Sequence, residues 1–167
     1  MLESASGSSP HAGLVDPITG LWSVELWEVV LNHEAARLAR YRRPVSIVAV
    51  EIEGLDELSG AFGVDVAINH VRAVAEILRR LTSPPDVVAR SDRGPFLVLL
   101  AEADETARLA FVKRLRADCD PWLEAARPGT RLAIHAVSPS AAQTLDVAVR
   151  VALDGVRVLP WRARPPA

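Results

Sequence analysis

The 167 residues, half of them hydrophobic, suit one domain with a hydrophobic core, and the net charge of −2 excludes a general electrostatic surface for nucleic acid. Apolar runs such as 45–50 are far shorter than the ~20 residues of a membrane span, and the first residues lack the basic and apolar regions of a signal peptide. We therefore expect a soluble, cytoplasmic protein. The single cysteine, Cys119, excludes an internal disulfide and cannot build a zinc site by itself.

The first third of the chain predicts a tail, a turn, a helix and a strand. Residues 1–14 are rich in Ser, Gly, Pro and Ala, so we expect a disordered tail. Residues 16–21 form turns, and Ser23 is a candidate N-cap for a helix over 24–40, whose apolar residues recur at helical spacing. The run 45–53 is continuously apolar and then alternates, which is typical of a central strand.

The middle of the chain predicts two helical segments and a hairpin. Residues 54–63 make a short helical or irregular connection, and 64–81 carry the pattern of a strongly amphipathic helix. A strand over 87–91, a turn and a second strand over 96–100 follow. The turn between the strands, residues 92–95, is the tip of this hairpin.

The last third predicts helices alternating with strands. Asp104 caps a helix, and Pro121 is expected to end it. A strand covers 131–137, and residues 140–143 match a capping box that opens another helix. A turn and a short edge strand are predicted over 154–159.

The predicted order of elements is α-β-α-α-β-β-α-β-α-β. Helices packed on one face of a mostly antiparallel central sheet of about five strands give an α+β sandwich. We expect a single domain over 15–160, followed by a C-terminal tail over 161–167.

Several segments, in one order and at matching spacing, resemble the motifs of a known family. They are Asp16-Pro17-Ile18-Thr19-Gly20-Leu21, the strand 43–53, Phe62-Gly63, residues 86–90 before the hairpin, and residues 145–152 with 155–158. On these residues the chain resembles the GGDEF (diguanylate cyclase) family from about 16 to 158. The resemblance implies that family's nucleotidyl-cyclase-like sandwich.

The resemblance also assigns the positions of a metal site. The family joins two GTP molecules into cyclic di-GMP, with divalent metal held on acidic side chains. Its first-strand metal ligand corresponds to Glu51, and the acidic residue two positions on corresponds to Glu53. The acidic pair of its hairpin corresponds to Gly94 and Pro95, which offer no carboxylate. We therefore expect a degenerate domain without catalytic residues, metal or cofactor.

The positions that bind nucleotide in the family have changed as well. Two small hairpin residues correspond to Asp92 and Arg93, the base-reading Asn and Asp to Ser59 and Ile68, and the phosphate-binding Lys to Leu153. A product-inhibition motif Arg-x-x-Asp would retain Asp86 but has Ser83 in place of the Arg. These changes together indicate loss of the nucleotide site rather than its adjustment.

Two sets of residues keep alternative interpretations. Glu51 and Glu53 could bind a cation, although solvated carboxylates at a strand end are favoured, because a metal site needs more converging oxygens. Trp22 and Trp161 lie near the ends of predicted elements, and exposed large aromatics are typical interface anchors. They are therefore candidates for a partner-binding surface.

The favoured function is a catalytically inactive GGDEF-like domain acting as a regulatory or scaffolding module in bacterial signalling. Its partner would be an unidentified protein, and a homodimer is left open. The alternatives are a nucleotide sensor that binds GTP or cyclic di-GMP in a remodelled pocket near Glu51, Arg90 and Arg93, and an enzyme with altered chemistry. The resemblance does not by itself place the protein in cyclic di-GMP signalling.

Overall fold

The computed structural model describes residues 13–90, 94–126, 129–140 and 142–156. Within these ranges the elements are α1 (Val24–Tyr41), β1 (Val45–Glu53), α2 (Leu55–Phe62), α3 (Val64–Leu81), β2 (Val87–Arg90), β3 (Phe96–Ala101), α4 (Glu105–Ala125), β4 (Arg131–Val137) and α5 (Leu145–Val156). None of the helices in the described ranges combines the length and the apolar character needed to cross a bilayer.

The described strands form one antiparallel sheet in the order β2-β3-β1-β4. β1 is central, as predicted: Val48 pairs with Val98 of β3 on one side and with Ala136 of β4 on the other. The sheet has four strands in the described chain, where about five were expected. Val156 ends α5 instead of beginning the predicted last strand, whose other residues lie outside the described ranges.

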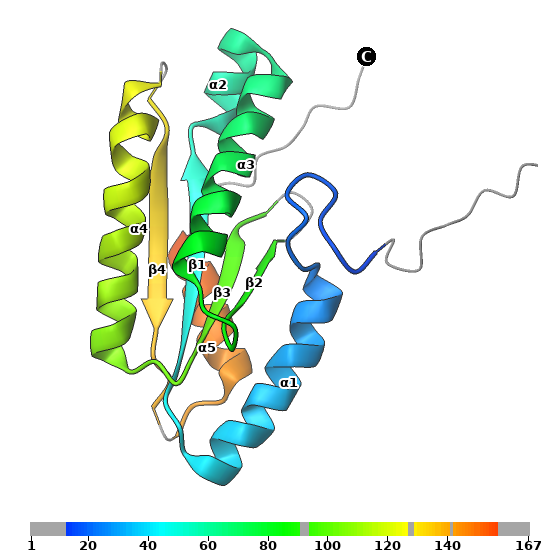
Figure 1. Cartoon of the computed structure of the whole chain (residues 1–167), viewed down its shortest axis with the longest axis vertical. Helices are drawn as coiled ribbons and strands as arrows, with labels where there is room; N and C mark the ends of the chain where they lie inside the picture. The colour runs from blue at the N-terminus through cyan, green and yellow to red at the C-terminus, as the bar shows by residue number, and fades with distance from the viewer. Residues whose placement is uncertain (1–12, 91–93, 127–128, 141, 157–167) are drawn as a thin grey trace, which may run out of the picture.

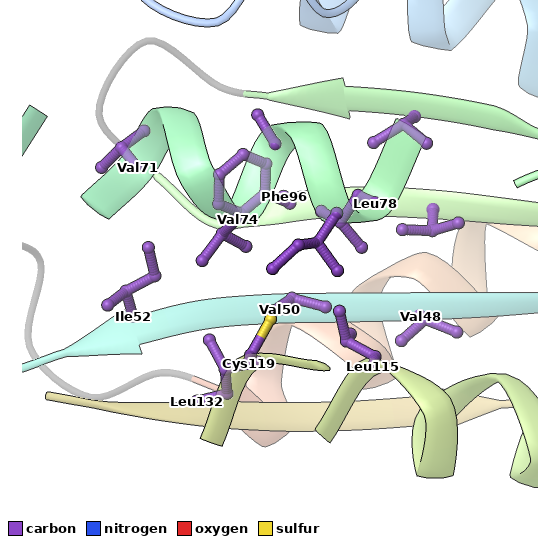
Figure 2. Close-up of a cluster of buried hydrophobic side chains, with 14 of the residues drawn as sticks. Val48, Val50, Ile52, Val71, Val74, Leu78, Phe96, Leu115, Cys119 and Leu132 are labelled. Atoms are coloured by element: carbon purple, nitrogen blue, oxygen red, sulfur yellow. The ribbon is translucent and has the colours of Figure 1, made fainter. Parts of the chain in front are cut away.

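Helices cover both faces of the sheet, so the expectation of helices on one face is wrong. Alternate residues of β1 point to opposite faces and both sets are buried. Val48, Val50 and Ile52 pack against α3 and α4, as Figure 2 shows. Ile47 and Ala49 pack against α1 and α5 on the other face. Figure 1 shows α5 behind the sheet and α3 in front of it.

Helix boundaries agree with the prediction at the start of α1 and differ farther along. The Ser23 hydroxyl caps α1 by accepting from the Leu26 N–H at 3.4 Å. Pro121 does not end its helix, because α4 continues through it while Cys119 and Leu123 on either side remain fully buried. Tertiary packing thus outweighs the hydrogen bond that a proline removes.

The start and the end of α5 also differ from the prediction. The Ser140 carbonyl accepts from the Gln143 N–H at 2.9 Å, and α5 begins only at Leu145, after the predicted capping box. The turn expected at 154–155 is absent, since both residues belong to α5. Gly155 packs directly on His135 of β4. This close approach explains a glycine within the helix.

Candidate functional site at the base of the hairpin

Glu51 lies near the end of β1, where the family resemblance places a metal ligand. Its side chain is half-buried, so it is less open to solvent than an exposed carboxylate at a strand end. Burial raises the pKa of Glu51 to about 7, against the opposing effects of the Arg90 charge and of the Ile52 backbone N–H. Near neutral pH the group is thus divided between its neutral and charged forms.

Arg90, at the end of β2, is buried and forms an ion pair with Asp16. Its Nη1 lies 3.3 Å from each carboxylate oxygen of Asp16, and its guanidinium lies 5.6 Å from the centre of the Phe96 ring. Phe96 faces α3 and α4, whereas alternation along β1 places Glu51 on the face of Ile47 and Ala49. Arg90 and Glu51 therefore occupy opposite faces at the same end of the sheet.

The segment containing Asp16, which we call the N-terminal turn (residues 14–22), is fastened to α3 and β2. Within the turn, the Asp16 carboxylate accepts from the Thr19 N–H at 2.9 Å and from the Thr19 hydroxyl at 2.5 Å. Arg79 of α3 donates to the Thr19 carbonyl at 2.6 Å. The Arg90 N–H donates to the Trp22 carbonyl at 2.9 Å. The N-terminal turn thus supports the hairpin base.

Two other acidic residues near the site are engaged elsewhere. Glu53 forms an ion pair with Arg131, its cross-strand partner on β4. Asp86, part of the supposed product-inhibition motif, accepts from the backbone N–H groups of Ser83 at 2.8 Å and Ala101 at 2.9 Å. Both carboxylates therefore have structural partners.

The other predicted positions lie on several elements of the fold. Gly94 and Pro95 are half-buried just before β3, and Ser59 and Ile68 are half-buried on α2 and α3. Leu153 of α5 packs against the apolar cluster under α1 and α5. Asp92 and Arg93 lie outside the described residues, so their place in the site stays a prediction.

A small cavity at the hairpin base has a volume of about 10 Å³, the room of roughly one water molecule. Glu51, Arg90, Gly94 and Phe96 are among the residues that line it. In the described part of the chain, no three His, Cys, Asp or Glu side chains gather as they would around a metal ion. Among the described residues that line the cavity, Glu51 is the one that carries a carboxylate.

Trp22 is 39% exposed, and its backbone bridges both Val15 and Ala89. Leu14 and Val15 beside it are also exposed. Trp22 therefore has the exposure that a contact residue needs. Trp161 lies outside the described residues.

The family described as "Diguanylate cyclase, GGDEF domain" matches residues 13–144. The chain belongs to the GGDEF family. The match covers the N-terminal turn, the four described strands and the hairpin, so the family resemblance read from the sequence is confirmed. A search of curated protein sequences finds no match to this GGDEF domain.

Solved GGDEF structures share the fold at low sequence identity. The GGDEF domain of DgcB from Caulobacter crescentus in complex with c-di-GMP has a TM-score of 0.76 at 13% identity, covering 91% of this chain and 88% of that one. Diguanylate cyclase SiaD from Pseudomonas aeruginosa, in complex with its activator SiaC, has a TM-score of 0.75 at 16% identity, covering 87% of this chain. This GGDEF domain spans 57% of the SiaD chain.

Another similar structure belongs to a protein with further domains. Vibrio cholerae LapD, solved as an S helix-GGDEF-EAL chain bound to c-di-GMP, has a TM-score of 0.67 at 19% identity. The alignment covers 86% of this chain and 34% of LapD. At these identities the likeness establishes the GGDEF fold, which the family resemblance implied.

Sequence reasoning found the positions at the hairpin base but missed their partners. Asp16 and Arg90 were both recognised as parts of motifs, yet their ion pair was not expected. The pairing of Glu53 with Arg131 was missed as well. A signal existed for the second pair, because opposite charges at the ends of two strands are common cross-strand neighbours. The register that makes them neighbours is not visible in the sequence.

Proposed function

We propose that this GGDEF domain is catalytically inactive and serves as a regulatory or scaffolding module that binds a protein partner in bacterial signalling. The observation that carries the proposal is the set of carboxylates at the hairpin base. Gly94 and Pro95 replace the acidic pair, and Glu53 is held by Arg131, which leaves Glu51 among the described carboxylates there. Mg²⁺ in phosphoryl-transfer sites relies on several converging oxygens to neutralise the phosphates.

Incubation of the purified protein with GTP and Mg²⁺ or Mn²⁺ tests the loss of catalysis. We expect no cyclic di-GMP and no other nucleotide product. Glu51→Ala is the matched control, because a genuine reaction at this site would need the carboxylate that the described residues keep there. A product formed by the natural chain and lost in Glu51→Ala would contradict the proposal and indicate an enzyme with altered chemistry.

Thermal unfolding separates a scaffold from a nucleotide sensor. A ligand present at about 100 times its dissociation constant stabilises a protein by roughly 2.7 kcal/mol, which raises the melting temperature of such a domain by several degrees. We expect no shift with millimolar GTP plus Mg²⁺ or with cyclic di-GMP. A concentration-dependent shift that Glu51→Gln alters would favour the sensor.

The N-terminal turn offers the contact surface for the partner. Leu14, Val15 and Trp22 form an exposed apolar group, and large aromatics are frequent energetic anchors of interfaces. The complex of SiaD with its activator SiaC supports the idea that a protein of this family works through a protein partner. Trp161 remains a second candidate anchor.

Affinity capture without nucleotide, with the partner identified by mass spectrometry and then purified, tests this surface. Trp22→Ala should weaken the purified complex at least tenfold, the loss of about 1.4 kcal/mol that an anchor residue commonly exceeds. Phe62→Ala is the control, because Phe62 is 55% exposed at the end of α2, outside the N-terminal turn. Equal binding by Trp22→Ala and the natural chain would contradict a contact at Trp22.

A further inference from the structure

β4 occupies one edge of the described sheet, with β1 as its neighbour there. In an antiparallel edge strand, alternate residues direct their backbone N–H and C=O groups away from the sheet. Such an edge can pair with a strand of another molecule. The sequence of β4, Arg-Leu-Ala-Ile-His-Ala-Val, contains no proline and one charged residue at its start, so the strand itself does little to prevent pairing.

Two arginines of α4 contact this edge. Figure 1 shows α4 running alongside β4, and the two elements are in direct contact. Nη1 of Arg108 donates to the Ala136 carbonyl at 2.5 Å, and Nη1 of Arg116 donates to the Leu132 carbonyl at 3.4 Å. The Arg108 side chain is only 14% exposed. Both arginines therefore occupy acceptors that an added strand would use.

The spacing of the contacts fits the two elements. Eight residues along a helix advance about 12 Å, and four residues along a strand advance about 13 Å. Arg108 and Arg116 are therefore separated by nearly the distance between the carbonyls of Ala136 and Leu132. Because the two elements run in opposite directions, the earlier arginine meets the later residue of the strand.

We propose that Arg108 and Arg116 close the β4 edge to strand pairing with a second copy of this chain. Two copies of β4 could pair antiparallel about a twofold axis, each supplying the same backbone groups to the other. Leu132, Ile134 and Ala136 are alternate residues of β4. The arginines bind the carbonyls of the first and the last of these residues, and so prevent this pairing. Any homodimer of the natural chain then uses a surface other than β4.

Sedimentation velocity over a range of concentrations tests the proposal with the double variant Arg108→Ala/Arg116→Ala. We expect self-association roughly tenfold tighter than in the natural chain, as one or more uncovered carbonyls pair across the new interface. Lys113→Ala/Arg114→Ala is the matched control, since it removes two exposed cations from the same helix. A folded double variant that associates no more than the natural chain or the control would overturn the proposal.

Amide hydrogen exchange locates the new contact. In the associated double variant the β4 amides should exchange more slowly than in its dilute form, and slowing confined to other elements would overturn the proposal. If the double variant does not fold, circular dichroism shows this, and Arg116→Ala alone serves instead because its side chain is 45% exposed. For Arg116→Ala we expect tighter self-association and slower exchange of the β4 amides, both smaller than in the double variant. The absence of these changes would equally overturn the proposal.

Discussion

Arg90 and Asp16 lie 74 positions apart in the chain and form a buried ion pair, with Nη1 of Arg90 3.3 Å from both carboxylate oxygens. The pair joins the end of β2 to the N-terminal turn. It lies beside the site at which the family carries out its chemistry, and its residues belong to two motifs by which the family is recognised. This region therefore has a structural role that does not depend on catalysis.

Removing one member of this pair should be costly. Asp16→Ala leaves a buried, uncompensated guanidinium, so we expect the free energy of unfolding to fall by about 3–5 kcal/mol in urea denaturation. Asp16→Ala/Arg90→Ala should cost less than the sum of the single variants. Arg80→Ala is the control, because its ion pair with Asp118 is exposed and should contribute about 1 kcal/mol or less. Additive costs at Asp16 and Arg90 would contradict the coupling.

The buried carboxyl of Glu51 should make stability depend on pH. The folded protein keeps this proton up to about pH 7, whereas the unfolded chain loses it near the ordinary value of 4.5. Between these values the folded state binds more protons, so the free energy of unfolding should fall as pH rises through this window.

Glu51→Gln tests this dependence in urea denaturation at a series of pH values. We expect the variant to lose that decline and to be more stable above pH 7 by about 1–3 kcal/mol, a range that allows for the partial exposure of the carboxyl. Glu57→Gln, at an exposed position of α2, is the control and should keep the decline. A Glu51→Gln profile parallel to that of the natural chain would rule out this origin of the pH dependence.

Two glycines in helices should respond to alanine in opposite ways. A Cβ at Gly155 would overlap the His135 side chain, so Gly155→Ala should lower the free energy of unfolding by about 1–3 kcal/mol. At Gly60 of α2 an added Cβ meets no heavy atom within 4 Å, and Gly60→Ala should stabilise by about 0.5–1 kcal/mol. The combined variant His135→Ala/Gly155→Ala should recover part of the loss. Equal effects of alanine at the two glycines would show that His135 does not restrict position 155.

The Cys119 thiol should be unreactive in the folded protein. Its side chain is fully buried on α4, and burial, with Asp120 and Asp118 nearby, raises the pKa of the thiol to about 12. A thiol that remains protonated and inaccessible reacts slowly with disulfide reagents. We expect labelling by Ellman's reagent only after denaturant is added, and rapid labelling of the native protein would contradict the burial of Cys119.

The sequence by itself determined the type and order of most elements and the family. Helical periodicity marked α1 and α3, and the continuously apolar run of β1 marked a central strand, because these patterns depend on residues close together in the chain. The continuous apolar run of β1 already implied that both faces of the sheet are buried. The expectation of helices on one face did not take this into account. The family resemblance implied the positions of Glu51, Gly94 and Pro95 in the site.

Only the tertiary structure decided how these positions are held. The partners of Arg90 and Glu53, the protonation of Glu51 and the contacts of Arg108 and Arg116 with β4 all depend on strand register and on how helices cross the sheet. Pro121 stayed within α4 because burial on both sides of it outweighed a local preference. Such contacts join residues far apart in sequence, and their energies depend on burial, which local pattern does not specify.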